Sequence, residues 1–231
     1  MAQVRTDFPL DITVDMVLRG QGADPEKVRA RKPVLIDLAE QAIRKGSPYI
    51  KPVVVSGRYS IERVSLDGVQ LEHGTHLDGI LIGEHLTHAE QVVIAICTVG
   101  MELENTIIST ANNGDVALSL ALDGLANAAV DCLSLKVCQQ IEEDALKEGL
   151  HTTIALGPGM VGWPLEIGQP QIFRLLQPDE SIVQLLPSML MIPRKSSSIL
   201  IGVGNRVRKT GQTCQYCAVN GVCRYHQEIN N

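Results

Sequence analysis

Three cysteines and one histidine lie close together near the C-terminal end of the sequence. The stretch TCQYCAVNGVCRYH, residues 213–226, holds Cys214, Cys217, Cys223 and His226. A Cys-x2-Cys pair puts two sulfurs on one turn, which is the commonest beginning of both zinc and iron–sulfur sites. The Asn-Gly dipeptide before the third cysteine favours the turn that would close the loop. We therefore predict a metal site with these four residues as ligands.

The identity of the metal depends on the fourth ligand. His226 would complete a Cys3His set, which is typical of zinc. Cys97, Cys132 or Cys138 would instead complete a four-cysteine set, which is typical of an iron–sulfur cluster. Cys132 and Cys138 are six residues apart, so on a helix they point about 240° apart and cannot both face one site. A third interpretation is that the terminal cysteines bind no metal.

The composition indicates a cytoplasmic globular protein. The chain of 231 residues is 45% hydrophobic and 20% charged, with a net charge of −6, and it is long enough to bury a core. No apolar run has the length of a signal peptide or a membrane span, so we expect no membrane partner. The acidic net charge argues against nucleic acid as a partner.

The charge is unevenly distributed along the chain. No acidic residue occurs between Glu180 and Glu228. This interval carries Arg194, Lys195, Arg206, Arg208, Lys209 and Arg224. Basic surroundings stabilise thiolates and attract anionic cofactors or acidic proteins. The alternative is an ordinary solvated basic surface.

The elements that must position these residues alternate between helices and strands. Asp24-Pro25 is a typical helix start and Gly46 a typical stop. The segment 51–72 alternates as strands around an LDG turn, and 79–83 and 91–100 are predicted as buried strands. A short amphipathic helix is predicted from Gln171 to Leu176. We predict that 182–193 and 196–204 are two strands of one sheet.

The segment from Val116 to Lys147 gives the strongest helix prediction. It begins after NNGD and ends before Gly149. Because it is apolar around most of its circumference, we expect a central buried helix. This helix is either straight or kinked near Gly124. One polar stripe interrupts it, formed by Asp123, Asn127 and Asp131 at i, i+4 and i+8. This stripe faces either solvent, the interpretation we favour, or a ligand cleft.

These elements predict an α+β fold with a mixed, largely antiparallel twisted sheet and a long central helix. We place a domain at 1–204 and a basic, cysteine-rich extension at 205–231. The extension would pack on the edge of the sheet.

An ordered set of short motifs in the last third resembles a known family. The motifs are Pro158-Gly159, Trp163-Pro164, Leu175-Leu176, Met191-Ile192-Pro193 and Ser196 to Ser198. In this order and spacing the chain resembles the activation domain of vitamin B12-dependent methionine synthase, especially its free-standing bacterial relatives. DMVLRGQG at 15–22, AICTVG at 95–100 and the long helix also lie where those relatives have theirs.

The resemblance implies an activation-domain-like fold that binds S-adenosylmethionine. It implies Pro158, Gly159, Met160 and Trp163 as cofactor-binding positions. The implied activity is the reductive reactivation of oxidised cobalamin on a separate cobalamin-binding methyltransferase, an accessory role in methionine biosynthesis. An acidic electron donor such as a flavodoxin or ferredoxin would serve it, and this context favours iron–sulfur over zinc at the cysteines.

Two departures favour a rival function. The family's arginine aligns with Ala155 and its tyrosine with Met160, and the cysteine-rich segment stands where relatives place further tyrosines. Asp123 or Asp131 could supply a carboxylate, although no motif assigns one. The rival is a non-enzymatic metal-binding adaptor that docks to a corrinoid or redox partner and no longer binds S-adenosylmethionine.

Overall fold

The central element of the fold is α6, Val116–Lys147, in a computed structural model that describes residues 2–218. The Asp115 carboxylate accepts the Leu118 N–H at 3.1 Å and caps the first turn. Gly149, with φ of +75°, takes the left-handed conformation that commonly follows a helix. The predicted helix and both of its boundaries are confirmed.

Six further α-helices and nine strands surround α6 in the described part of the chain. The helices are α1 (Val14–Gly20), α2 (Pro25–Arg31), α3 (Val34–Gly46), α4 (Ile80–His85), α5 (Met101–Asn112) and α7 (Leu165–Leu176). The strands are β1 (Gln3–Arg5), β2 (Val53–Ser65), β3 (Gly68–Leu71), β4 (His76–Asp78), β5 (Gln91–Thr98), β6 (His151–Thr152), β7 (Gln184–Leu185), β8 (Met191–Ile192) and β9 (Ser196–Gly204).

The main sheet has the strand order β4-β3-β2-β5-β9-β6, with β1 paired to the first part of β2. Its pairings are antiparallel, and the long central pairs set Val53 opposite Thr98 and Thr98 opposite Ser196. The predicted α+β fold with a largely antiparallel sheet is therefore confirmed. Strand β9, which carries the end of the resemblance motif, lies between β5 and the short edge strand β6.

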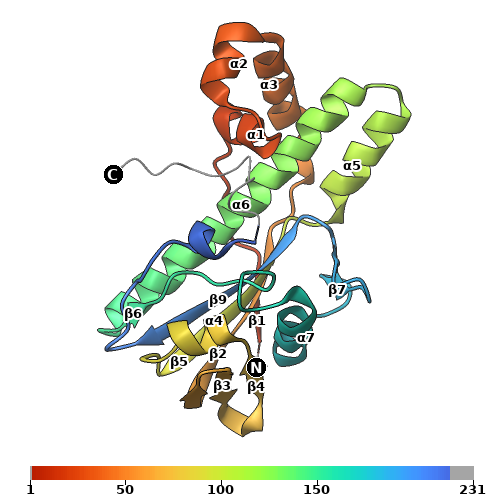
Figure 1. The fold of residues 1–231 in the computed structure, drawn as a ribbon. Helices are drawn as coiled ribbons and strands as arrows, with labels where there is room; N and C mark the ends of the chain where they lie inside the picture. Colours follow the sequence, from red (N-terminus) through yellow and green to blue (C-terminus); the bar gives the residue numbers. More distant parts are fainter. Residues whose placement is uncertain (1, 219–231) are drawn as a thin grey trace.

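The sheet is covered on both faces, as Figure 1 shows. Alternate residues of β5 point to opposite sides, so Ile94 and Ile96 face α4 and α7, while Ala95 and Cys97 face the C-terminal half of α6. The N-terminal half of α6 extends beyond the sheet and packs against α1, α3 and α5. One helix thus joins a helical layer to the sheet.

Three sequence predictions need correction. A single helix from Asp24 to Gly46 is wrong, because Pro33 separates α2 from α3. Residues 79–83 belong to α4 and not to a strand, since periodicity cannot distinguish a short apolar run in a strand from one in a helix. The helix predicted from Gln171 begins earlier, at Leu165, and includes Pro170.

The segment 182–193 is also not a strand of the main sheet. It contains β7 and β8, which pair with each other in a separate two-stranded sheet. Pro187 lacks an N–H and Met189 has a φ of +64°, so the segment turns back on itself. Only β9, of the two predicted strands, enters the main sheet.

Helix α6 is long and apolar enough to cross a membrane by composition. Two thirds of its most apolar window, 67%, is buried inside the fold, however. Such burial is typical of the core helix of a soluble protein.

Candidate functional site

The glycine loop, residues 157–163, joins the sheet region to α7 and contains the predicted cofactor-binding positions. Leu156 pairs with Leu200 of β9, which fixes the start of the loop against this strand. Within the loop the Gly159 N–H donates to the Trp163 carbonyl at 2.9 Å, and the Met160 N–H donates to the Gly157 carbonyl at 3.3 Å. Gly159 has a φ of +93°, so its tight turn favours glycine. These backbone donors are occupied inside the protein.

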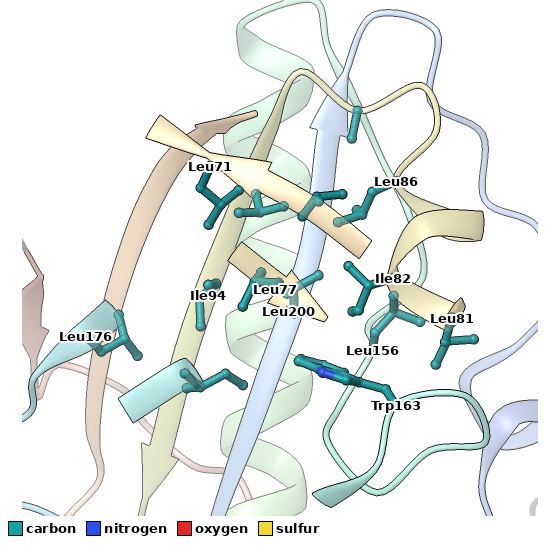
Figure 2. Close-up of a cluster of buried hydrophobic side chains, with 14 of the residues drawn as sticks. Leu71, Leu77, Leu81, Ile82, Leu86, Ile94, Leu156, Trp163, Leu176 and Leu200 are labelled. Atoms are coloured by element: carbon teal, nitrogen blue, oxygen red, sulfur yellow. The ribbon is translucent and has the colours of Figure 1, made fainter. Parts of the chain in front are cut away.

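Trp163 lies beneath the glycine loop in the main core. Figure 2 shows its ring beside Leu156, Leu81 and Ile82, and it is completely buried. A Cβ on Gly168 would lie 2.6 Å from the ring, so α7 approaches the indole closely. Trp163 therefore anchors the loop. Of the four predicted positions, Pro158, Gly159 and Met160 retain partial or greater exposure.

A short C-terminal segment, residues 213–217, lies across the glycine loop, and we call it the strap. The Thr213 hydroxyl donates to the Ala155 carbonyl at 2.9 Å. The Val161 N–H donates to the Tyr216 carbonyl at 2.8 Å, and the Tyr216 ring meets His85 edge to face, with centroids 4.7 Å apart. Burial lowers the pKa of His85, so the neutral imidazole is favoured beside the tyrosine.

The strap carries Cys214 and Cys217, the first two predicted metal ligands. The Cys217 N–H donates to the Cys214 carbonyl at 3.2 Å, so the pair lies on one turn as the spacing predicts. Cys217 also pairs with Met160 of the glycine loop in an isolated β-bridge. Cys223 and His226 fall outside the described residues. The structure thus joins the start of the predicted metal site to the predicted cofactor loop.

The core cysteines do not join this pair. Across residues 2–218, no group of three or more His, Cys, Asp or Glu side chains could hold a metal ion. Burial raises the pKa of the Cys97 thiol to about 12 and that of Cys138 to about 11. Both thiols are therefore protonated at neutral pH, the form that does not bind metals.

Alkylation should separate the two kinds of cysteine. At pH 8 a pKa of about 12 leaves about one Cys97 side chain in ten thousand as the thiolate. We expect iodoacetamide to modify the exposed Cys214 at least about a hundredfold faster than Cys97 in the native protein, as measured by peptide mass spectrometry. In urea, where the protein is unfolded, the two cysteines should be alkylated at equal rates, which is the control. Equal rates in the native protein would contradict the burial of Cys97.

The polar stripe on α6 faces the chain rather than solvent along part of its length. The Lys195 ammonium lies 2.8 Å from an Asp123 carboxylate oxygen and donates to the Asn127 side-chain oxygen at 2.7 Å. The Asn127 amide in turn donates to the Gly20 carbonyl at 2.8 Å. The Glu104 carboxylate accepts the backbone N–H of Lys195 at 2.8 Å. Asp123 pairs with Lys195 but keeps 44% of its side chain exposed, so the favoured prediction of a solvated stripe is wrong for Asn127 and not for Asp123.

Asp131 is the third member of the stripe and differs from the other two. It is exposed, and its carboxylate makes no hydrogen bond or ion pair with any residue from 2 to 218. Partial desolvation by the surrounding chain raises its pKa, and the charge of Lys195 opposes this shift. Asp131 is thus the carboxylate of the stripe that remains available to a ligand.

The start of β9 links the two groups of residues. Ser197 shares a 2.6 Å hydrogen bond with Ser134 of α6 on one face of the sheet. On the other face Gln169 donates to the Ser198 hydroxyl at 2.8 Å. A Cβ on Gly157 would lie 3.2 Å from the Ser198 carbonyl, so the glycine loop packs closely on this strand. Sequence reasoning missed Gln169 and the pairing role of Lys195, because no motif or spacing marks either residue.

The comparisons with known proteins support the fold. No family model and no curated protein matches the chain. Among solved structures, the chain is similar to a crystal structure of the MetH reactivation domain bound to AdoHcy, with a TM-score of 0.64 and 13% sequence identity. The match covers 92% of this chain and 81% of that one. At this identity the likeness establishes a shared fold, in agreement with the sequence resemblance.

Proposed function

We propose that the protein takes part in the reactivation of a cobalamin-dependent methyltransferase and binds S-adenosylmethionine or its product AdoHcy. The observation that carries the proposal is the fold shared over 92% of the chain with the MetH reactivation domain, which was crystallised with AdoHcy. The ordered motifs from Pro158 to Ser198 support the same relationship. Fold alone does not define function, so the residues of the site must also fit such a ligand.

The residues present fit such a ligand only in part. The glycine loop provides a half-buried Pro158 and an exposed Gly159, but the N–H groups of Gly159, Met160 and Val161 already donate to Trp163, Gly157 and Tyr216. Asp131 offers a carboxylate for the positively charged end of the ligand. We therefore propose that carbonyl oxygens of the loop and the Asp131 carboxylate contact the ligand. S-adenosylmethionine would supply the methyl group and leave AdoHcy as the product, and one electron would come from an external donor.

The same proposal extends to the partners. A separate cobalamin-binding methyltransferase would hold the corrinoid, and an acidic donor such as a flavodoxin or ferredoxin would supply the electron. Arg206 and Arg208 are exposed in the segment before the strap, and Lys209 pairs with Glu142 at 2.6 Å. A basic surface of this kind accelerates the association of an acidic protein.

We propose an iron–sulfur cluster or zinc at the strap, with Cys214 and Cys217 as the first two ligands and Cys223 and His226 as the others. Iron content, zinc content and the visible absorbance of anaerobically purified protein distinguish the metals. The double substitution Cys214→Ser and Cys217→Ser should remove the metal, while Cys132→Ser in α6 serves as the matched control. Retention of stoichiometric metal by the double variant would contradict this ligand set.

Titration calorimetry on the metal-loaded protein tests the main proposal. AdoHcy and S-adenosylmethionine should each bind saturably at a 1:1 ratio. Asp131→Asn should weaken the binding about tenfold, because a charge-assisted hydrogen bond contributes about 1.5–3 kcal/mol. Glu143→Gln, an exposed carboxylate on the same helix, is the matched control and should leave the affinity unchanged.

The strap favours a second candidate function. It binds the Ala155 carbonyl just before the glycine loop and the Val161 N–H within it, so it lies where a ligand would otherwise dock. In this alternative the protein is a metal-binding adaptor that docks to a corrinoid or redox partner without S-adenosylmethionine. An absence of binding heat with the metal content intact would support the adaptor and contradict the first proposal.

A further inference from the structure

A cavity of about 350 Å³ lies between the C-terminal half of α6 and the sheet. It is on the opposite face of the sheet from Trp163 and the core beneath the glycine loop. Strand alternation shows this directly, since Val54 lines the cavity while Val55 packs into the core around Trp163. The cavity is therefore separate from the site proposed above, and nothing inferred from it rests on that proposal.

The inner part of the cavity is apolar. Aliphatic side chains line it from both layers: Val54, Val93 and Val203 from the strands, and Val137, Ile141 and Ala145 from α6. The three helix residues recur at i, i+4 and i+8, so one stripe of α6 forms the whole inner wall on that side. A lining of this kind accepts a small aliphatic group and disfavours sugars or phosphates.

The rim of the cavity carries charges of both signs. Arg5 and Arg58 lie on the strand side. The Arg58 guanidinium is held in place by both Glu148 carboxylate oxygens, at 2.6 and 2.7 Å. The Arg5 Nε atom donates to the Asp7 carboxylate at 3.3 Å, and its guanidinium lies 4.8 Å from the centroid of the Phe8 ring. Two fixed guanidinium groups therefore border the apolar interior, and each retains N–H groups beyond those bonds.

Asp144 forms the helix side of the rim. Its Oδ1 atom accepts hydrogen bonds from Lys147 at 2.8 Å and Gln140 at 3.1 Å. The Lys147 bond lowers the pKa of this carboxyl, so it is ionised at neutral pH. These two bonds use one of the two carboxylate oxygens, and a carboxylate can accept on both. A cationic group at the rim would therefore have an oriented acceptor.

We propose that this cavity binds a small zwitterion with an aliphatic body, namely an aliphatic α-amino acid. The carboxylate would meet the Arg5 and Arg58 edge, the ammonium would meet Asp144, and the side chain would enter the apolar interior. The carboxylate of a fatty acid would bind the arginines but would be repelled by Asp144. The ammonium of a simple amine would bind Asp144 but would be repelled by the arginines. Only a ligand with both charges matches both sides of the rim.

L-leucine and its two single-charge analogues test the proposal on the full chain. 4-Methylpentanoic acid lacks the ammonium and isoamylamine lacks the carboxylate, while both keep the side chain. Calorimetry should show leucine binding with a Kd below about 1 mM. Each analogue should bind at least about tenfold more weakly, because each loses one charge-assisted hydrogen bond. Equal binding of either analogue, or no binding by leucine, valine, isoleucine or methionine at ~10 mM, overturns the proposal.

Variants locate the site. Asp144→Asn and Arg5→Gln should each weaken leucine binding about tenfold, while Glu143→Gln, one residue away and outside the cavity lining, should not. Thermal unfolding of each variant checks that the fold is kept. In methyl NMR spectra, leucine should shift the Val137 and Ile141 signals.

AdoHcy distinguishes this site from the one on the glycine loop. AdoHcy should not displace leucine, because none of the residues that line the cavity is among those proposed to contact AdoHcy. Unchanged leucine affinity in Asp144→Asn, or displacement of leucine by AdoHcy, would place leucine elsewhere and overturn the inference. A failure of AdoHcy to bind at all would count against the proposed function and leave the leucine result intact.

Discussion

Replacing Trp163 by alanine is expected to lower the free energy of unfolding by about 3–5 kcal/mol. The indole is completely buried under the glycine loop, and both Gly79 and Gly168 allow backbone to approach it closely. Removing the indole leaves a cavity, because the backbone at Gly79 and Gly168 is part of packed elements and cannot move in to close it. A loss of this size is a large share of the stability of a typical domain. Urea unfolding followed by far-ultraviolet circular dichroism measures it.

A phenylalanine substitution at Trp163 shows how much stability comes from packing volume rather than from a hydrogen bond. The Trp163 Nε1 atom has no hydrogen-bond partner among the residues the structure describes, so Trp163→Phe loses volume but no hydrogen bond. We expect it to cost about 1–2 kcal/mol. Val161→Ala in the exposed part of the same loop is the control and should cost less than about 0.5 kcal/mol. If Trp163→Ala were as stable as the wild type, the indole would not anchor the loop.

Replacing Gly20 by alanine is expected to destabilise the protein by about 1–3 kcal/mol. A Cβ at this position would lie 2.2 Å from the Gly124 carbonyl oxygen, because α1 and α6 cross with their backbones in contact. Both partners are helical backbone, so neither can move alone. Alanine is by itself the better helix former by about 1 kcal/mol, and the clash must exceed that gain. Calorimetric unfolding measures the net effect.

The same substitution should disturb the polar stripe. The Gly20 carbonyl accepts the Asn127 amide, and Asn127 in turn accepts the Lys195 ammonium. We therefore expect the backbone amide signals of Asn127 and Lys195 to shift in NMR spectra of Gly20→Ala. Arg19→Ala, one residue earlier and exposed, is the control and should leave both signals in place. A stable Gly20→Ala protein with unchanged signals would contradict the close crossing.

Local patterns predicted the elements whose signals lie within one segment. The α6 boundaries follow from a capping aspartate, continuous apolar helical spacing and a terminal glycine, all within 35 residues of sequence. Strands β5 and β9 follow from apolar runs of the correct length. The strand prediction for residues 79–83 failed because three aliphatic residues between two glycines suit a buried strand and a buried helix equally. The prediction of one sheet for 182–193 failed because Pro187 and Met189 turn the chain locally.

The sequence by itself determined the α+β class, the long central helix, the order of the resemblance motifs and the spacing of Cys214 and Cys217. All of these depend on residues that are near one another in the chain. Only the tertiary structure decided that the strap lies on the glycine loop, that Trp163 is core, and that Lys195 neutralises Asp123. Those contacts join residues tens of positions apart. They are set by the packing of whole layers, on which no local pattern carries information.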